Sequence, residues 1–234
     1  MSEAHTHAPR GQNPMQAALD EEDAVVGDEI VRHKLSSRII HWAVALTFFG
    51  AMFSGLPVWS PVFGWMAHAF GGLQVCRWLH AWIGVAFAVS SLAMFIQWFR
   101  VMQFDPSDKK FSLKFYVSFS DDEDPDVGRY NGGQKFYFYA AFAGAVALLA
   151  SGIVLWWPMS FAIPWRWAAV ILHDLSFIAF FAAMAGHVYL STIFEPGTFE
   201  SMTRGTVTKD WARTHHPRWY REVTGQSTAR DKEI

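Results

Sequence analysis

Four histidines lie inside long apolar stretches of the chain: His41, His80, His173 and His187. An ionisable residue within a membrane-spanning segment is costly and by default marks a functional site. Three of them lie about one turn inside the end of a predicted span, and His187 lies about two turns inside. Their depths match in pairs, which predicts two sites that each present two imidazoles. Two neutral imidazoles without a thiolate or carboxylate make a poor zinc site but suit haem iron.

Long uncharged blocks dominate the composition. Of the 234 residues, 52% are hydrophobic. Asp, Glu, Lys and Arg are absent from 39–76, 78–99 and 136–165, and 167–194 contains only Asp174. A helix crosses the hydrocarbon core of a membrane with about 20 apolar residues. The sequence therefore predicts an integral membrane protein.

The blocks divide into four predicted spans, at 37–58, 74–99, 135–157 and 166–194. The interrupted apolar segment 59–73 is typical of a short piece lying along the membrane interface. The predicted fold class is all-α, an integral membrane four-helix bundle. Residues 1–30 are polar and lack the apolar core of a secretory signal, so we expect a disordered tail there.

Lys and Arg residues collect on alternate connections. They are frequent before the first span, between the second and third spans, and in the C-terminal tail, whereas the other two connections contain only Arg77 and Arg166. Positive charge favours the cytoplasmic side. We therefore expect both termini in the cytoplasm.

This orientation pairs the histidines by depth. His41 and His187 fall near the cytoplasmic face, and His80 and His173 fall near the outer face. His173 and His187 are 14 residues apart, which corresponds to a rise of about 21 Å on nearly the same helix face. Gly55 follows His41 by 14 residues, so we expect it at the level of the outer site, where a missing side chain leaves room for a flat cofactor.

Two arginines each precede a predicted ligand by three residues: Arg38 before His41, and Arg77 before His80. Residues three apart are neighbours on a helix, so each guanidinium could bind a haem propionate. Cations at helix ends also mark the membrane interface without any ligand, and the sequence leaves both readings open. The role of Asp174 is equally open.

Other interpretations of the histidines are weaker. A single membrane histidine would as readily hydrogen-bond across helices, but four in depth-matched pairs favour ligation. A proton or metal transporter would carry ionisable residues through the bilayer centre, which here is Phe, Ala, Leu and Met. The single cysteine, Cys76, excludes an intrachain disulfide and a C-x-x-C-H covalent haem attachment.

The chain resembles a known family from about residue 31 to 222. The matching segments are Arg38-Ile39-Ile40-His41-Trp42, Arg77-Trp78-Leu79-His80, Val127 to Lys135, the His173/His187 pair and Trp211 to Glu222. The most specific parts are Tyr130-Asn131-Gly132-Gly133-Gln134-Lys135 and His215-His216-Pro217-Arg218-Trp219-Tyr220-Arg221. In these segments the chain resembles the gamma subunit, a di-haem cytochrome b, of membrane-bound respiratory formate dehydrogenases.

The resemblance implies two b haems with His41/His187 and His80/His173 as axial ligands, in a cytochrome b domain at 31–222 followed by a C-terminal tail at 223–234. It implies an iron–sulfur beta subunit and a molybdenum- or tungsten-pterin alpha subunit, which oxidises formate. This chain would itself have no catalytic residue for formate. We expect a multi-pass protein of the bacterial inner membrane, in a higher-order oligomer of the complex, with lipid and quinone but no nucleic acid as further partners.

The resemblance also implies that electrons enter at the outer haem and leave at the cytoplasmic haem to a quinone, menaquinone or ubiquinone. It places the quinone near Asn131 and His187, and Gln134 and Lys135 are further candidates. A quinone site needs an apolar slot with a few polar groups. The same residues could instead form a loop-to-helix junction with Lys135 as an interface anchor.

The nearest alternative keeps the chemistry and changes the partner: a di-haem cytochrome b subunit of a hydrogenase or of a thiosulfate or polysulfide reductase. Among the remaining histidines, we expect His33 to be solvated, with a proton relay as the alternative, and His215 and His216 to serve tail packing. The acidic run 121–126 is expected to be a solvated loop face or a partner contact.

Overall fold

Four long apolar helices dominate the computed structural model, which describes residues 18–106, 108 and 127–226. They are α2 (Leu35–Trp59), α3 (Leu73–Trp98), α5 (Gly132–Trp156) and α6 (Ile163–Tyr189), the last continuing into a π-helical turn, η4 (Leu190–Phe194). Within the described ranges, these four are long and apolar enough to cross a membrane. The predicted spans and the all-α membrane fold are therefore confirmed.

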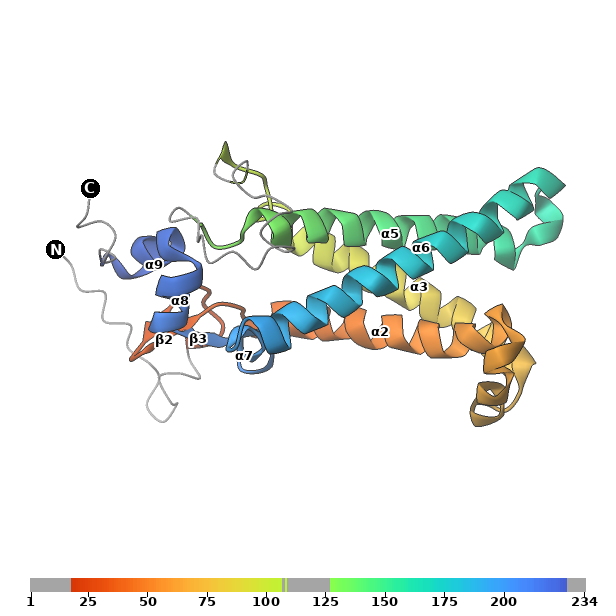
Figure 1. The fold of residues 1–234 in the computed structure, drawn as a ribbon, viewed down its shortest axis with the longest axis horizontal. Helices are drawn as coiled ribbons and strands as arrows, with labels where there is room; N and C mark the ends of the chain where they lie inside the picture. Colours follow the sequence, from red (N-terminus) through yellow and green to blue (C-terminus); the bar gives the residue numbers. More distant parts are fainter. Residues whose placement is uncertain (1–17, 107, 109–126, 227–234) are drawn as a thin grey trace. The chain divides into compact units, whose positions relative to one another are not determined.

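The chain divides into two units. The helical unit comprises residues 39–103 and 136–188, and the polar unit comprises the described parts of 1–38, 104–135 and 189–234. In the helical unit the four long helices run alongside one another (Figure 1). Its buried centre takes one residue from each helix: Phe48, Phe87, Ala145 and Phe180. Outward-facing residues such as Leu46 and Ile96 are about two-thirds exposed, as lipid-facing side chains of a membrane bundle are.

Two of the connections between the long helices contain a short 3₁₀ helix. The segment predicted to lie along the interface is the 3₁₀ helix η1 (Pro61–Phe70), which begins with Ser60 accepting a hydrogen bond from the Val62 N–H (3.4 Å). Gly71 ends it with a φ of 86°, a left-handed conformation that glycine adopts without strain. A shorter turn, η3 (Pro158–Ser160), precedes α6.

The polar unit is built on a small antiparallel sheet. Strands β1 (Val25–Val26), β2 (Glu29–Val31) and β3 (Thr206–Thr208) lie in that order. Helices α7 (Thr198–Thr203), α8 (Lys209–His215) and α9 (Pro217–Thr224) complete the unit. Its core contains Ile30, Val207, Trp211, Ala212, Trp219 and Tyr220.

Two sequence expectations fail in this unit. Residues 25–31 do not belong to a disordered tail, because β1 pairs with β2, and β2 pairs with β3, which lies about 180 residues later in the chain. His33 is not solvated: it is 2% exposed and stacks on Tyr130, with ring centroids 6.2 Å apart. Residues 1–17 and the acidic run 121–126 lie outside the described residues.

Candidate functional site

Helices α2 and α6 bring His41 and His187 together, as predicted. Their ring centroids are 6.2 Å apart and their planes make an angle of 53°. The His187 ring stacks on Tyr137 of α5, with centroids 4.8 Å apart and planes 4° from parallel. The Nδ1 atom of His41 is buried and has no hydrogen-bond partner among the described residues. We call these two residues the inner pair.

Helices α3 and α6 bring together His80 and His173, which we call the outer pair. Their ring centroids are 6.0 Å apart at 75°. His80 Nδ1 donates to the Ala51 carbonyl (2.9 Å), and His173 Nδ1 lies 2.9 Å from the Ser151 hydroxyl. Both rings of the outer pair are thus tethered through Nδ1.

These tethers select one tautomer. A carbonyl can only accept, so His80 carries its proton on Nδ1. The Ser151 hydroxyl donates to the Ala147 carbonyl (2.7 Å), which turns its lone pair toward His173 Nδ1–H. In both residues Nε2 keeps an unprotonated lone pair, the form of imidazole that binds a metal.

Gly55 lies at the level of the outer pair, as expected, but its role is more specific than leaving room for a cofactor. A Cβ at this position would come within 2.7 Å of the His80 imidazole. Gly152 faces His173 more loosely, since its Cβ would lie 3.6 Å from the ring. The close approach of α2 to the imidazole therefore requires glycine at position 55.

The two arginines differ in their surroundings. Arg38 donates to the carbonyls of Met202 (3.3 Å) and Thr203, at the end of α7. Arg77 is exposed. Asp174 is half-buried beside His173 on α6.

The residues expected at the quinone form the start of α5. Asn131 Oδ1 accepts from the Gln134 N–H (2.8 Å), while Gln134 Oε1 accepts from the Asn131 N–H (3.1 Å). This reciprocal capping box satisfies the free N–H groups of the helix end. It uses the oxygens of both side chains and neither amide nitrogen.

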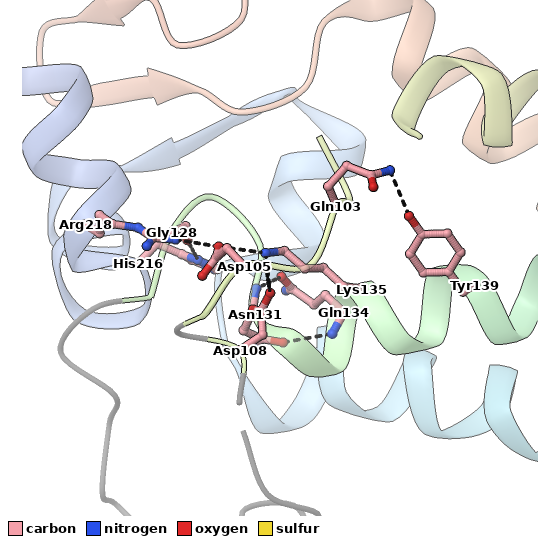
Figure 2. A network of polar contacts seen from close by, with 10 residues as sticks. All are labelled: Gln103, Asp105, Asp108, Gly128, Asn131, Gln134, Lys135, Tyr139, His216 and Arg218. Carbon is pink, nitrogen blue, oxygen red and sulfur yellow. Dashed lines mark hydrogen bonds and ion pairs between the residues drawn. The ribbon is translucent and has the colours of Figure 1, made fainter. Parts of the chain in front are cut away.

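Lys135 is 4% exposed and lies in an ion cluster, shown in Figure 2. Its Nζ is 3.0 Å from Asp105 and 2.7 Å from Asp108. Asp105 also accepts from Arg218 Nη2 at 2.9 Å. Lys135 is therefore held by two carboxylates, which neither the quinone reading nor the interface reading anticipated.

Sequence reasoning missed Tyr137, Ser151 and the two carboxylates that hold Lys135. Ser151 carried a weak signal, because it is one of the few polar residues in an apolar span. Tyr137 carried none, since an aromatic residue in a membrane helix is ordinary. The contacts of Asp105 and Asp108 depend on folding of a connection whose sequence shows no periodic pattern.

Comparisons with known proteins place the chain in a family. The profile of the prokaryotic cytochrome b561 family matches residues 32–205. The cytochrome b556(fdo) subunit of formate dehydrogenase from Escherichia coli K12 is 37% identical over 84% of this chain and 94% of its own length. The nitrate-inducible cytochrome b556(Fdn) subunit of the same organism is 31% identical over 87% and 96%, and the cytochrome b556 subunit from Haemophilus influenzae is 32% identical over 82% and 83%.

The chain belongs to the formate dehydrogenase cytochrome b subunits, within the prokaryotic cytochrome b561 family. The resemblance inferred from the sequence motifs is thereby confirmed. Membership implies b-type haem, which is held without covalent attachment and needs only axial side-chain ligands.

The histidine pairs of this cytochrome b subunit fit that cofactor. An imidazole nitrogen binds a metal at about 2 Å, so two rings on opposite sides of one metal atom have centres roughly 6 Å apart. The centroid distances of the inner and outer pairs, 6.2 and 6.0 Å, match this spacing. The orphaned Nδ1 of His41 and the free Nε2 lone pairs of the outer pair are the donors such a site needs.

Proposed function

We propose that this protein is the membrane subunit through which a formate dehydrogenase reduces quinone. One haem b would be held by His41 and His187, and a second by His80 and His173. The observation that carries the proposal is the presence of two imidazole pairs, each about 6 Å between ring centroids, on helices able to cross a membrane. A structural role for single histidines does not require this repeated spacing.

When bound, the two haems supply one-electron carriers that link an electron donor at the outer face to a quinone at the cytoplasmic face. The chain contributes the orientation of the ligands. Ala51 and Ser151 hold the outer imidazoles by their Nδ1 atoms, and Tyr137 holds the plane of His187 by stacking. Such outer contacts fix the ring and raise the basicity of the ligating nitrogen.

The partners follow from the relatives, which are named as subunits of formate dehydrogenase. We propose that an iron–sulfur beta subunit delivers the electrons and that a molybdenum- or tungsten-pterin alpha subunit oxidises formate. The same names favour formate over the hydrogenase and sulfur-compound alternatives. The complex would lie in the bacterial inner membrane, with both termini of this chain in the cytoplasm as the Lys and Arg distribution indicates.

The quinone contacts proposed in this chain are Asn131 and Gln134, with Lys135 and His187 as further candidates. Asn131 and Gln134 suit the role because their capping box leaves both amide nitrogens as possible donors to a quinone carbonyl. Changing Asn131 to Ala should slow quinone turnover while haem content stays unchanged. Loss of a haem in that variant would contradict the assignment.

Arg38 and Arg77 remain candidates for haem propionates. Arg77 is exposed, so its guanidinium can reach an acidic group. Arg38 already donates to two carbonyls, and a propionate would have to share its five N–H groups. We therefore propose Arg77 as the stronger of the two.

The experiment that tests the proposal is the haem content of the purified chain, measured as pyridine haemochrome per polypeptide and as a reduced-minus-oxidised spectrum. Two non-covalent b haems per chain are expected. One haem would show that a pair is misassigned. A folded preparation without haem would overturn the electron-transfer function.

A further inference from the structure

The segment His215–Arg221 is one of the most specific parts of the family resemblance, yet it contributes to neither of the two histidine pairs nor to the capping box of α5. In the structure it lies at the junction of α8 and α9, where His216 is 1% exposed. His216 Nδ1 donates to the Gly128 carbonyl (2.7 Å), and the Arg218 N–H donates to the Val127 carbonyl (3.1 Å). The segment His215–Arg221, called the tail below, thus binds the backbone of residues 127–128, in the loop that leads to Asn131.

Gly128 shows how tight this contact is. A Cβ on Gly128 would lie 2.5 Å from Arg218 Nη2, which is closer than side chains tolerate. The Arg218 guanidinium therefore lies directly against the backbone of residue 128. Glycine at this position allows the tail to approach the loop.

The second ring nitrogen of His216 extends the contact. Nε2 accepts from Arg32 Nη2 (3.1 Å), and the same Nη2 donates to the Arg129 carbonyl (2.8 Å). Burial lowers the pKa of His216 well below its usual value, so the ring stays neutral with Nδ1 as donor and Nε2 as acceptor. Figure 2 shows His216 and Arg218 reaching Gly128 and Asp105.

Arg32 is itself fully enclosed. Its guanidinium carbon lies 4.8 Å from the Trp211 ring, 5.0 Å from Trp219 and 5.5 Å from Tyr130. Burial lowers its pKa to about 10, so it remains a cation at neutral pH and benefits from the aromatic faces. The loop carbonyl of Arg129 is thereby fixed to a rigid, aromatic-lined centre.

The far end of the loop is held through a shared carboxylate. Asp105 accepts from Arg218 Nη2 (2.9 Å) and from Lys135 Nζ (3.0 Å). The tail therefore binds the loop directly at residues 127–128 and indirectly at Lys135. Asn131 and Gln134 lie between these two attachments.

We propose that His216 and Arg218 are positioning residues for quinone: they hold residues 127–135 so that Asn131 meets its ligand in one geometry. The proposal rests on the quinone role of Asn131 proposed above. Gly132 and Gly133 follow Asn131 directly, and glycine loses the most conformational entropy when it is fixed. Without the attachments, quinone binding would have to order this loop, which costs affinity.

The test compares His216→Asn with His216→Gln in the purified, detergent-solubilised full-length chain. The Asn amide nitrogen replaces Nδ1 and can still donate to Gly128, whereas the Gln amide lies at the position of Nε2. His215→Asn is the matched control, because His215 neighbours His216 but contacts Trp211 rather than the loop. Arg218→Ala is matched by Arg213→Ala, because the Arg213 guanidinium pairs with the exposed Asp210 on α8, at 2.8 Å.

The measured quantity is the dissociation constant for two probes, menadione and decylubiquinone, at equal haem content. Loss of a buried hydrogen bond should weaken binding about tenfold in His216→Gln and Arg218→Ala. His216→Asn should recover most of the affinity, and both control variants should bind as the unchanged chain does. Hydrogen exchange at residues 128–131 should quicken in the same two variants.

The outcomes separate this proposal from the one it rests on. If the unchanged chain binds neither probe, the quinone site is wrong, while faster exchange in His216→Gln would still show the loop attachment. If the unchanged chain binds and the His216→Gln and Arg218→Ala variants keep its affinity, the positioning role is wrong. If affinity per haem is kept but less folded protein is recovered, the tail is structural only and the proposal fails.

Discussion

Buried histidines are used differently in the two units. In the polar unit, the protein binds both ring nitrogens of His216, to Gly128 and to Arg32. In the helical unit, the protein binds one nitrogen of His80 and of His173, and Nδ1 of His41 has no partner among the described residues. A histidine with both nitrogens bonded is a structural element, whereas one with a free nitrogen beside a second imidazole is prepared for a metal.

The two histidine pairs of the helical unit also differ from each other. The outer imidazoles are oriented by hydrogen bonds, and the inner His187 is oriented by stacking on Tyr137. Hydrogen bonding to a ligating histidine tunes the metal as well as the ring orientation. We therefore expect the two proposed haems to differ in reduction potential.

The largest expected effect is the loss of a whole haem. Changing His173 to Ala should remove about half of the haem absorbance per chain, because one of the two proposed haems would lose a ligand. Quinone reduction by formate in the complex should stop. His216→Ala should retain both haems. Equal haem loss in the two variants would contradict the conclusion that His216 is structural and His173 is a ligand.

A smaller loss of haem binding is expected from a substitution at Gly55, where the backbone of α2 approaches His80. In Gly55→Ala the new Cβ would lie 2.7 Å from the His80 ring, and overpacking of this kind costs about 1–3 kcal/mol. Haem binding at the outer pair should weaken while the inner pair is unaffected. Gly152→Ala is the control, since its Cβ would make an ordinary contact at 3.6 Å; it should behave as the unchanged chain in a haem titration.

Removing the hydrogen bond that orients His173 should change the reduction potential at the outer pair. Ser151→Ala deletes the acceptor of His173 Nδ1–H and should cost about 1 kcal/mol. Both haems should remain, but redox titration should show a shifted potential for one of them. Ser90→Ala removes a hydroxyl that bonds Phe87 and Thr47 but, in the part of the chain that the structure describes, no histidine. Identical shifts in both variants would count against the tether.

The smallest expected effect is a decrease in the stability of the polar unit as the pH falls. The folded state keeps His216 neutral because its pKa is lowered, by burial first and by Arg32 second. The unfolded chain takes up a proton near pH 6.5, so it binds more protons than the folded chain as pH falls. Stability is thus fully present above about pH 6.5 and declines below it.

Hydrogen exchange of residues 206–220 between pH 5 and 8 measures this decline. His216→Gln should be less stable overall but should show a shallower dependence on pH. A dependence as steep as in the unchanged chain would assign it to another group. His215, Arg32 and Arg129 are the charged or titratable neighbours that act on His216.

Sequence alone determined the membrane architecture and which histidines are the candidate haem ligands. Uncharged runs about 20 residues long have few alternatives to spanning helices, and each predicted span coincides with one helix. The helical rise converted the positions of four histidines into depths, and depth sorted them into the pairs that the structure brings together. Because an α-helix rises by a constant amount per residue, residue numbers within one span convert directly into depths.

Only the tertiary structure decided what holds those histidines and how residues 25–33 pack against residues 206–220. The Ala51 carbonyl, Ser151 and Tyr137 act on histidines of other helices, and no sequence spacing encodes which faces meet. Residues 25–31 look like part of a polar tail but form two strands, the second of which pairs with a segment about 180 residues later. Long-range pairing of this kind depends on closing the chain into its fold, so the buried His33 and His216 could be recognised only once that fold was present.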